Sequence, residues 1–158
     1  MARTETLTTA TPQDVWDVLM DPESYGHWVV GSSHIRDADP DWPRVGSRFH
    51  HSVGMRPLTL SDHTIVLEID PPRRLVLKAK ARPLGTARVE MRLHPSGGGT
   101  QIVMLEDPGD PISKLLFGNP LAHRLLRWRN VESLRRLRRL AEERAFRRES
   151  RATTTASA

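Results

Sequence analysis

The amino-acid sequence predicts an α+β protein in which a curved antiparallel sheet of about seven strands wraps around a long C-terminal helix, with two short helices after the first strand. Three observations predict it. A Thr-rich alternating run and a capped helix open the chain, alternating runs separated by turns fill residues 32–106, and a period of 3.6 residues follows residue 111.

The first elements are marked by helix-capping residues. Residues 3–9 have the side-chain alternation of a strand. A helix is predicted to follow, with Thr11 as its N-cap, Pro12 at its first position and Asp14 at position N3. A proline soon ends this helix, and a second short helix or turn carries Ser24–Trp28.

The middle of the chain predicts an antiparallel meander, because turn residues recur about every ten residues between alternating runs. One face of such a sheet is apolar and covered, and the other faces water. The predicted strands are Ser32–Asp37, Ser47–Val53, Leu58–Ile69, Leu75–Arg82, Thr86–His94 and Thr100–Glu106.

The C-terminal segment predicts one long amphipathic helix. Its apolar stripe consists of Leu125, Trp128, Val131, Leu134 (or Arg135), Leu137 and Leu140. It is the element long and apolar enough to cover the concave face of the sheet, and a sheet curved around one helix leaves space between them. We expect one domain over residues 1–148 and a disordered polar tail over 149–158.

The composition of the chain excludes several kinds of chemistry and of site. The chain has no cysteine, so disulfides, thiolate nucleophiles and cysteine metal sites are excluded. No metal-ligand spacing and no phosphate-binding glycine loop occurs, so we expect neither a metal nor a cofactor. The sequence has no apolar run long enough to span a bilayer and no apolar export signal, and a cytoplasmic protein is expected.

Charge is distributed unevenly along the chain. Residues 1–111 have a net charge of −3 and residues 112–158 a net charge of +8. Arginines beside Trp128 on the last helix could contact nucleic acid or an anionic membrane. The sequence favours a solvated outer face instead, because the apolar stripe is already used to close the cavity and arginine is a good helix former.

The stretches TETLTTATPQDVWDVLMDPESYGHW and VEMRLHPSGGGTQIVM, with the terminal amphipathic helix, resemble the polyketide cyclase/dehydrase (SRPBCC) family of the START-like superfamily, which has the helix-grip fold of the birch pollen allergen. The resemblance covers roughly residues 3–145 and is more specific for fold than for function. It implies an elongated internal cavity for a hydrophobic small molecule and, for an enzyme, cyclisation or dehydration of a polyketide-like substrate.

The expected ligand-binding residues are those whose strand or helix face points toward this space. They are Tyr25, Trp28, Phe49, Val89, Met91, Met104 and Trp128. Trp28 matches the family pattern and is either core or an aromatic wall for a flat ligand. Two arginines, Arg56 and Arg82, stand beside loops that could rim the mouth of the cavity or lie in solvent.

Four titratable residues are candidates for moving protons: His27, His51, Glu106 and His123. His51 lies in the cavity if the strand face of Phe49 points inward, and the opposite register is equally open. Glu106 either points inward beside Met104 or lies exposed at a strand end. By the same alternation, Glu90 belongs to a charged solvent face.

These observations leave three functions. The first is binding of a hydrophobic or aromatic small molecule, with or without cyclase/dehydratase-like chemistry. The second is a carrier or sensor without chemistry, and the third is contact of the basic helix with nucleic acid or membrane. Both a monomer and a homodimer are compatible with the sequence.

Overall fold

The computed structural model describes residues 1–53, 60–80 and 85–156. After β1 (Ala2–Thr8) come three short helices, α1 (Pro12–Met20), η1 (Pro22–Ser24) and α2 (Tyr25–Trp28). Six further strands follow: β2 (Ser32–Ala38), β3 (Arg48–Val53), β4 (Leu60–Asp70), β5 (Arg74–Lys80), β6 (Thr86–Ser96) and β7 (Gly99–Pro108). Two helices end the chain, α3 (Pro111–Gly118) and α4 (Pro120–Ala156).

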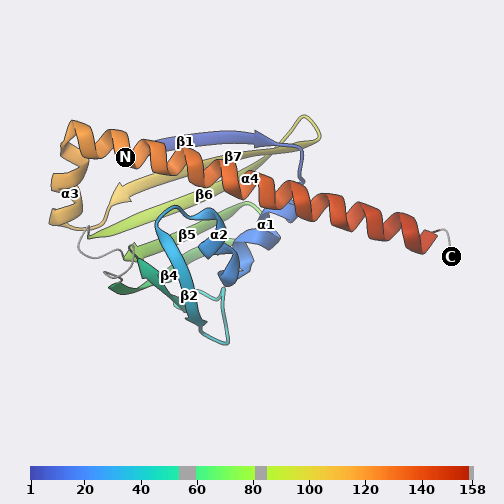
Figure 1. The fold of residues 1–158 in the computed structure, drawn as a ribbon, viewed down its shortest axis with the longest axis horizontal. Helices are drawn as coiled ribbons and strands as arrows, with labels where there is room; N and C mark the ends of the chain where they lie inside the picture. The colour runs from blue at the N-terminus through green and yellow to red at the C-terminus, as the bar shows by residue number, and fades with distance from the viewer. Residues whose placement is uncertain (54–59, 81–84, 157–158) are drawn as a thin grey trace.

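The strands form one antiparallel sheet. Within the described ranges it has seven strands in the order β1-β7-β6-β5-β4-β3-β2. The first strand of the chain is therefore an edge strand that pairs with the last one, β7. Helix α4 crosses the concave face along β1 and also packs against α1 (Figure 1). The predicted α+β helix-grip architecture is confirmed.

The helix α1 begins where the sequence predicts. The Oγ1 of Thr11 accepts a hydrogen bond from the backbone N–H of Asp14 at 3.2 Å, and an Oδ2 of Asp14 accepts one from the backbone N–H of Thr11 at 3.1 Å. This reciprocal pair satisfies two donors that the first turn of a helix leaves open. Asp14 is buried, and its carboxylate also pairs with Arg148 of α4 at 3.2 Å, which ties the two helices together.

The C-terminal segment contains a helix that the sequence analysis did not separate. Asp110 caps α3 by accepting a hydrogen bond from the backbone N–H of Ser113, and it also accepts two from Thr86 at the start of β6. The Ser113 backbone bond is the foremost cause that lowers the pKa of Asp110 to about 2, and the Thr86 bonds add to it. Asn119 then caps α4 through its Oδ1.

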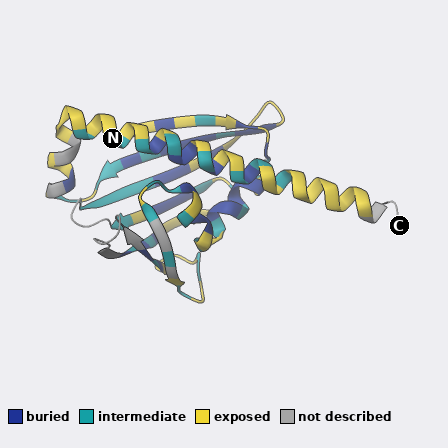
Figure 2. Cartoon of the chain, in the orientation of Figure 1, coloured by how far each residue is buried: buried dark blue, intermediate teal, exposed yellow. Residues whose placement is uncertain are grey.

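The predicted apolar stripe of α4 is wrong in its first half. Leu134 and Leu137 are buried in the core, whereas Trp128 and Val131 are 59% and 51% exposed. Successive residues of a helix are rotated by about 100°, so steps of three residues drift around the axis. Trp128 and Leu137 therefore lie on opposite sides. Figure 2 shows buried residues in the middle of α4 and exposed ones toward both ends.

The last residues also differ from the expectation. Residues 149–156 continue α4 instead of forming a tail without regular structure. Arginine and alanine favour helix, and the hydroxyls of Ser150, Thr153 and Thr154 donate to carbonyls one turn earlier. Arg56 and Arg82, expected at the rim of the cavity, lie outside the described residues.

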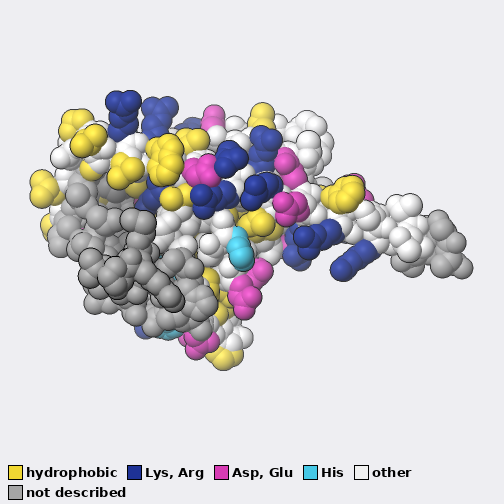
Figure 3. All heavy atoms as spheres, viewed as in Figure 1, with side chains coloured by type: hydrophobic (Ala, Val, Ile, Leu, Met, Phe, Trp, Pro, Cys, Tyr) yellow, Lys and Arg dark blue, Asp and Glu magenta, His cyan; other side chains and the backbone are white. Residues whose placement is uncertain are grey.

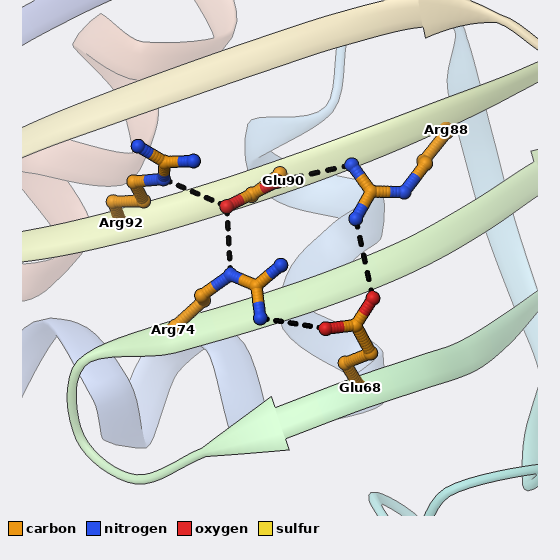
Figure 4. A network of polar contacts seen from close by, with 5 residues as sticks. All are labelled: Glu68, Arg74, Arg88, Glu90 and Arg92. Carbon is orange, nitrogen blue, oxygen red and sulfur yellow. Dashed lines mark hydrogen bonds and ion pairs between the residues drawn. The ribbon is translucent and has the colours of Figure 1, made fainter.

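The outer face of the sheet has a network of charged residues around Glu90. As predicted, Glu90 faces away from the cavity, but its side chain is only 5% exposed, because three arginines lie over it. Arg74, Arg88 and Arg92 donate to its carboxylate at 2.7, 3.0 and 2.7 Å, and Glu68 bridges Arg74 and Arg88 (Figure 4). The hydrogen bond from Arg74 is the foremost cause that lowers the pKa of Glu90 to about 2.

This network makes stability depend on acid pH. Because the folded-state pKa of Glu90 lies below its ordinary value of 4.5, its contribution is complete above pH 4.5 and is lost as the pH falls toward 2. We expect Glu90→Gln to lower the free energy of unfolding by about 1–2 kcal/mol at neutral pH, since the arginines are partly solvated. Urea denaturation at a series of pH values measures both effects. A difference between the two proteins that stays constant down to pH 2 contradicts the assignment.

Candidate functional site: a cavity between the sheet and the last helix

A cavity of about 320 Å³ lies between the concave face of the sheet and α4. Side chains from α2, from strands β2 to β7 and from both C-terminal helices line it. The wall is mainly apolar, with Leu77, Ala79, Ala87, Val89 and Met104 on the sheet side. This volume is at the small end of the range of ligand pockets, about 300–1,000 Å³.

Aromatic rings form one wall. The Tyr25 ring lies 4.9 Å from that of Trp28 and 4.6 Å from that of Phe49. The Tyr25 hydroxyl donates to the backbone oxygen of Leu19 at 2.9 Å, and burial raises the pKa of the phenol far above its usual range. Tyr25 therefore contributes shape and apolar surface, and it remains neutral at physiological pH.

A polar cluster interrupts the apolar wall where α4 faces β7. The Glu106 carboxylate accepts two hydrogen bonds from Nη2 of Arg129, at 2.7 and 2.9 Å, and one from Nδ2 of Asn130 at 2.6 Å. Glu106 and Asn130 are buried, whereas the Arg129 side chain keeps 32% of its surface exposed. All three line the cavity, so the cluster both joins α4 to the sheet and gives the cavity a polar side.

Other polar groups reach the cavity from β2, β3 and α2. His51 is 6% exposed and lies 5.5 Å from the Phe49 ring. Trp28 and Ser32 also line the cavity, and within the described part of the chain neither the indole Nε1 of Trp28 nor the hydroxyl of Ser32 has a hydrogen-bond partner. A buried N–H without an acceptor is costly, and a ligand oxygen can satisfy it.

Among the described residues, no group of three His, Cys, Asp or Glu side chains could hold a metal ion. Nor does any helix in the described ranges have the length and hydropathy to cross a membrane.

A family model described as polyketide cyclase/dehydrase and lipid transport matches residues 2–142. The chain belongs to this family. The sequence resemblance to SRPBCC proteins is therefore confirmed. A search of curated proteins gives no match.

Solved structures share the fold of this family member. Protein NE0264 from Nitrosomonas europaea is 19% identical with a TM-score of 0.68, covering 90% of this chain and 94% of that one. Protein CV1439 from Chromobacterium violaceum is 20% identical with a TM-score of 0.63, covering 89% and 96%. An AHSA1-like protein from Aeromonas hydrophila is 19% identical with a TM-score of 0.60, covering 90% and 93%. At these identities the similarity concerns the fold.

The structure brings seven of the sequence-predicted residues together in the wall of the cavity. They are Tyr25, Trp28, Phe49, His51, Val89, Met104 and Glu106. Met91 shares their strand face but lies fully buried in the core outside the cavity. The inward register of Phe49 places His51 at the cavity and leaves His50 on the opposite face.

Three predicted residues do not reach the cavity: His27, His123 and Trp128 are all exposed. In α2, Tyr25 and Trp28 share the inward face, which turns His27 outward. In α4, His123 lies in the first turn, and its side chain is exposed although Asn130, two turns later on the same face, lines the cavity. Trp128 lies on the outer face, opposite Leu137.

Sequence reasoning missed Arg129, Asn130 and Ser133, which line the cavity from α4. For Asn130 a signal existed, because it precedes Leu134 and Leu137 by four and seven residues and so continues the buried face. A polar side chain on such a face needs a partner inside the protein. For Arg129 no comparable signal separates it from the other arginines of the helix.

Proposed function

We propose that this protein binds a mainly apolar, aromatic or polycyclic small molecule in the cavity between the sheet and α4. The observation that supports it is the mainly apolar cavity of about 320 Å³ with an aromatic wall. Three aromatic rings within 5 Å of a neighbour offer both faces and edges to a flat ligand. Membership of a family whose description includes cyclases, dehydrases and lipid transport agrees with such a ligand.

The polar groups of the wall give the ligand an orientation. A carbonyl or hydroxyl oxygen at the aromatic end would accept a hydrogen bond from the free Nε1–H of Trp28. At the α4 side, the Arg129 and Asn130 donors are directed to Glu106. The preferred ligand is therefore an apolar ring system with an acceptor at one end and no fixed charge, because a charge there would be desolvated without a new partner.

The test is native mass spectrometry of freshly purified protein, followed by organic extraction and identification of the released compound. We expect a stoichiometric small-molecule adduct that disappears after extraction. Protein without an adduct is then titrated with the neutral fluorescent probe N-phenyl-1-naphthylamine, which should bind at a ratio of one to one. Failure of both experiments contradicts the proposal.

Catalysis is a second candidate, and the position of His51 favours it. Its imidazole lies in the cavity wall beside Phe49, where it could transfer a proton to or from a bound substrate. Holding a flexible chain in one folded conformer would supply most of the rate enhancement for a cyclisation or dehydration. Of the four predicted proton-transfer residues, His51 and Glu106 are the ones that can act from the cavity.

Substitution of His51 by Asn separates an enzyme from a carrier. With the compound identified above, an enzyme should keep its affinity within about threefold and lose turnover by at least about 100-fold, a typical contribution of a general acid or base. A carrier or sensor has no turnover to lose and should keep its affinity for the released compound. Isothermal titration and product analysis by mass spectrometry measure the two quantities.

The basic outer face of α4 supports nucleic-acid binding less than its composition suggests. Arg135 and Arg136 both pair with Glu132, at 2.7 and 2.8 Å. Four further arginines of this helix, Arg138, Arg139, Arg144 and Arg148, also pair with acidic residues. Much of the positive charge in this half of the helix is therefore locally balanced.

A further inference from the structure

An apolar surface lies on the outside of the C-terminal helices at one end of the molecule. It consists of Leu115 on α3 and Leu121, Leu125, Trp128 and Val131 on α4, which are between 51% and 79% exposed. We call these five residues the apolar ridge. Figure 3 shows hydrophobic side chains gathered over α3 and the first turns of α4, with basic side chains beside them.

Most of the ridge lies on one face of α4, and Leu115 of α3 adds to it. Leu121, Leu125 and Trp128 are separated by four and three residues, which places them on one side of α4. The side chains that hold α4 on the sheet, Leu134 and Leu137, belong to the opposite side. The ridge therefore does not contribute to holding α4 on the sheet, and large apolar residues gathered on one exposed face mark an interaction surface.

The charges around the ridge indicate what it contacts. From Pro111 to Val131 the sequence has no acidic residue. Lys114, Arg124 and Arg127 are exposed, and none of them has an ion-pair partner among the residues that the structure describes. This contrasts with the later turns of α4, where most arginines pair with Glu or Asp. An apolar helix face flanked by unpaired cations suits the interface of an anionic lipid bilayer.

The ridge also adjoins the cavity. Leu125 is 65% exposed and at the same time lines the cavity, together with Ser113, Ala122 and Leu126 of the same two helices. We propose that the apolar ridge docks this protein on anionic membrane surfaces, so that the ligand exchanges between the bilayer and the cavity. The proposal of membrane docking depends only on the ridge, whereas the proposal of ligand exchange rests on the proposed function of the cavity.

A second copy of the chain fits the ridge less well. A two-fold contact through the ridge would bring Arg124 and Arg127 close to their own copies, and no acidic residue of this segment would balance them. Nucleic acid would use the cations but would leave the three leucines exposed. Lipid bilayers with anionic headgroups engage both features at once.

The experiment is vesicle flotation with the full chain. Vesicles of equal parts phosphatidylglycerol and phosphatidylcholine should bind the protein, and vesicles of phosphatidylcholine alone should bind it at least about tenfold more weakly. The double variant Leu121→Asn/Trp128→Ala and the double variant Arg124→Gln/Arg127→Gln should each bind at least about tenfold more weakly than the native chain. All four residues are exposed, so circular dichroism should show an unchanged fold.

Phe146→Ser is the matched control. Phe146 is 71% exposed on the same side of α4 but lies far beyond the ridge, so its loss should leave vesicle binding unchanged. If Phe146→Ser loses as much vesicle binding as the ridge variants, or if the native chain does not bind anionic vesicles, docking through the ridge is overturned.

Other outcomes would assign the ridge to another partner. A dimer in analytical ultracentrifugation that Leu121→Asn/Trp128→Ala abolishes would assign the ridge to a second copy of the chain. If the native chain binds a DNA duplex but no vesicles, and Arg124→Gln/Arg127→Gln loses the DNA binding, the ridge and its cations are assigned to nucleic acid.

A cavity variant separates the two proposals. Ala79→Trp fills the cavity and replaces none of the five ridge residues, so it should lose probe binding and still float with anionic vesicles. Transfer of N-phenyl-1-naphthylamine from anionic vesicles to the native protein, followed by its fluorescence, tests the exchange. Transfer that is equally fast in Leu121→Asn/Trp128→Ala overturns the exchange while leaving the cavity assignment in place.

Discussion

Substitution of Ala79 by Trp should abolish ligand binding while the protein stays folded. Ala79 is a small residue on β5 whose side chain lines the cavity. An indole at this position occupies the space that a ligand ring needs. We expect the affinity for N-phenyl-1-naphthylamine to fall at least about 100-fold, because about 3 kcal/mol of apolar burial is lost when the probe cannot enter.

The neighbouring residue supplies the control. Lys78 points to the opposite face of the sheet and is exposed, so Lys78→Trp adds the same group outside the cavity. It should bind the neutral probe as the native protein does. Ala87→Phe on β6, paired directly with Ala79, provides a second obstruction if the indole destabilises the fold. Native affinity in both cavity variants would show that the probe binds elsewhere.

Substitution of Glu106 by Ala should cause a large loss of stability. It leaves the Arg129 guanidinium and the Asn130 amide without the carboxylate to which they donate. Breaking a buried ion pair by removing one partner costs about 3–5 kcal/mol, and the exposed part of Arg129 recovers some of this through water. We therefore expect the free energy of unfolding to fall by about 3 kcal/mol in urea denaturation.

Glu143→Ala is the matched control for this measurement. Glu143 also pairs with an arginine of α4, but at 3.8 Å and with half of its side chain exposed. Such a pair contributes less than about 1 kcal/mol. A loss in Glu106→Ala no larger than in this control would mean that the polar cluster does not hold α4 on the sheet. A double-mutant cycle with Arg129→Ala measures the interaction of the pair directly.

The two variants also distinguish the roles of the two sides of the cavity. Ala79→Trp removes space and should leave the cluster at Glu106 intact. Glu106→Ala removes the link between sheet and helix. Any change in probe affinity in this variant then comes from α4 being held less firmly on the sheet. Comparison of probe affinity at a temperature where both variants are folded separates the two effects.

Several parts of the fold could be predicted because they depend on near neighbours in the sequence. The cap of α1 involves Thr11 and Asp14, three residues apart, and the structure has them at the predicted N-cap and N3 positions. Strand alternation has a period of two residues, which places Glu90 on the outer face and Val89 at the cavity. These features require only local geometry, so the sequence contains the information for them.

The burial of Glu90 and Glu106 could not be predicted in the same way. Glu90 is covered partly by Arg74, which is sixteen residues away and adjacent only through the pairing of β5 with β6. Glu106 is enclosed by side chains of α4 that meet it only after the helix crosses the sheet. Alternation gives the face on which a carboxylate lies, but its exposure depends on long side chains from other strands and helices.

The sequence by itself determined the order of the strands, the antiparallel meander and the inward face of β6, because hydrophobic periodicity and turn residues act over a few positions. Only the tertiary structure decided which turns of α4 face the sheet. Over its length this helix presents apolar residues on several sides, and contact with β1 and α1 selects Leu134 and Leu137. The same contact turns Trp128 outward and brings Arg129 and Asn130 to Glu106, since one rotation of a rigid helix sets all of these positions together.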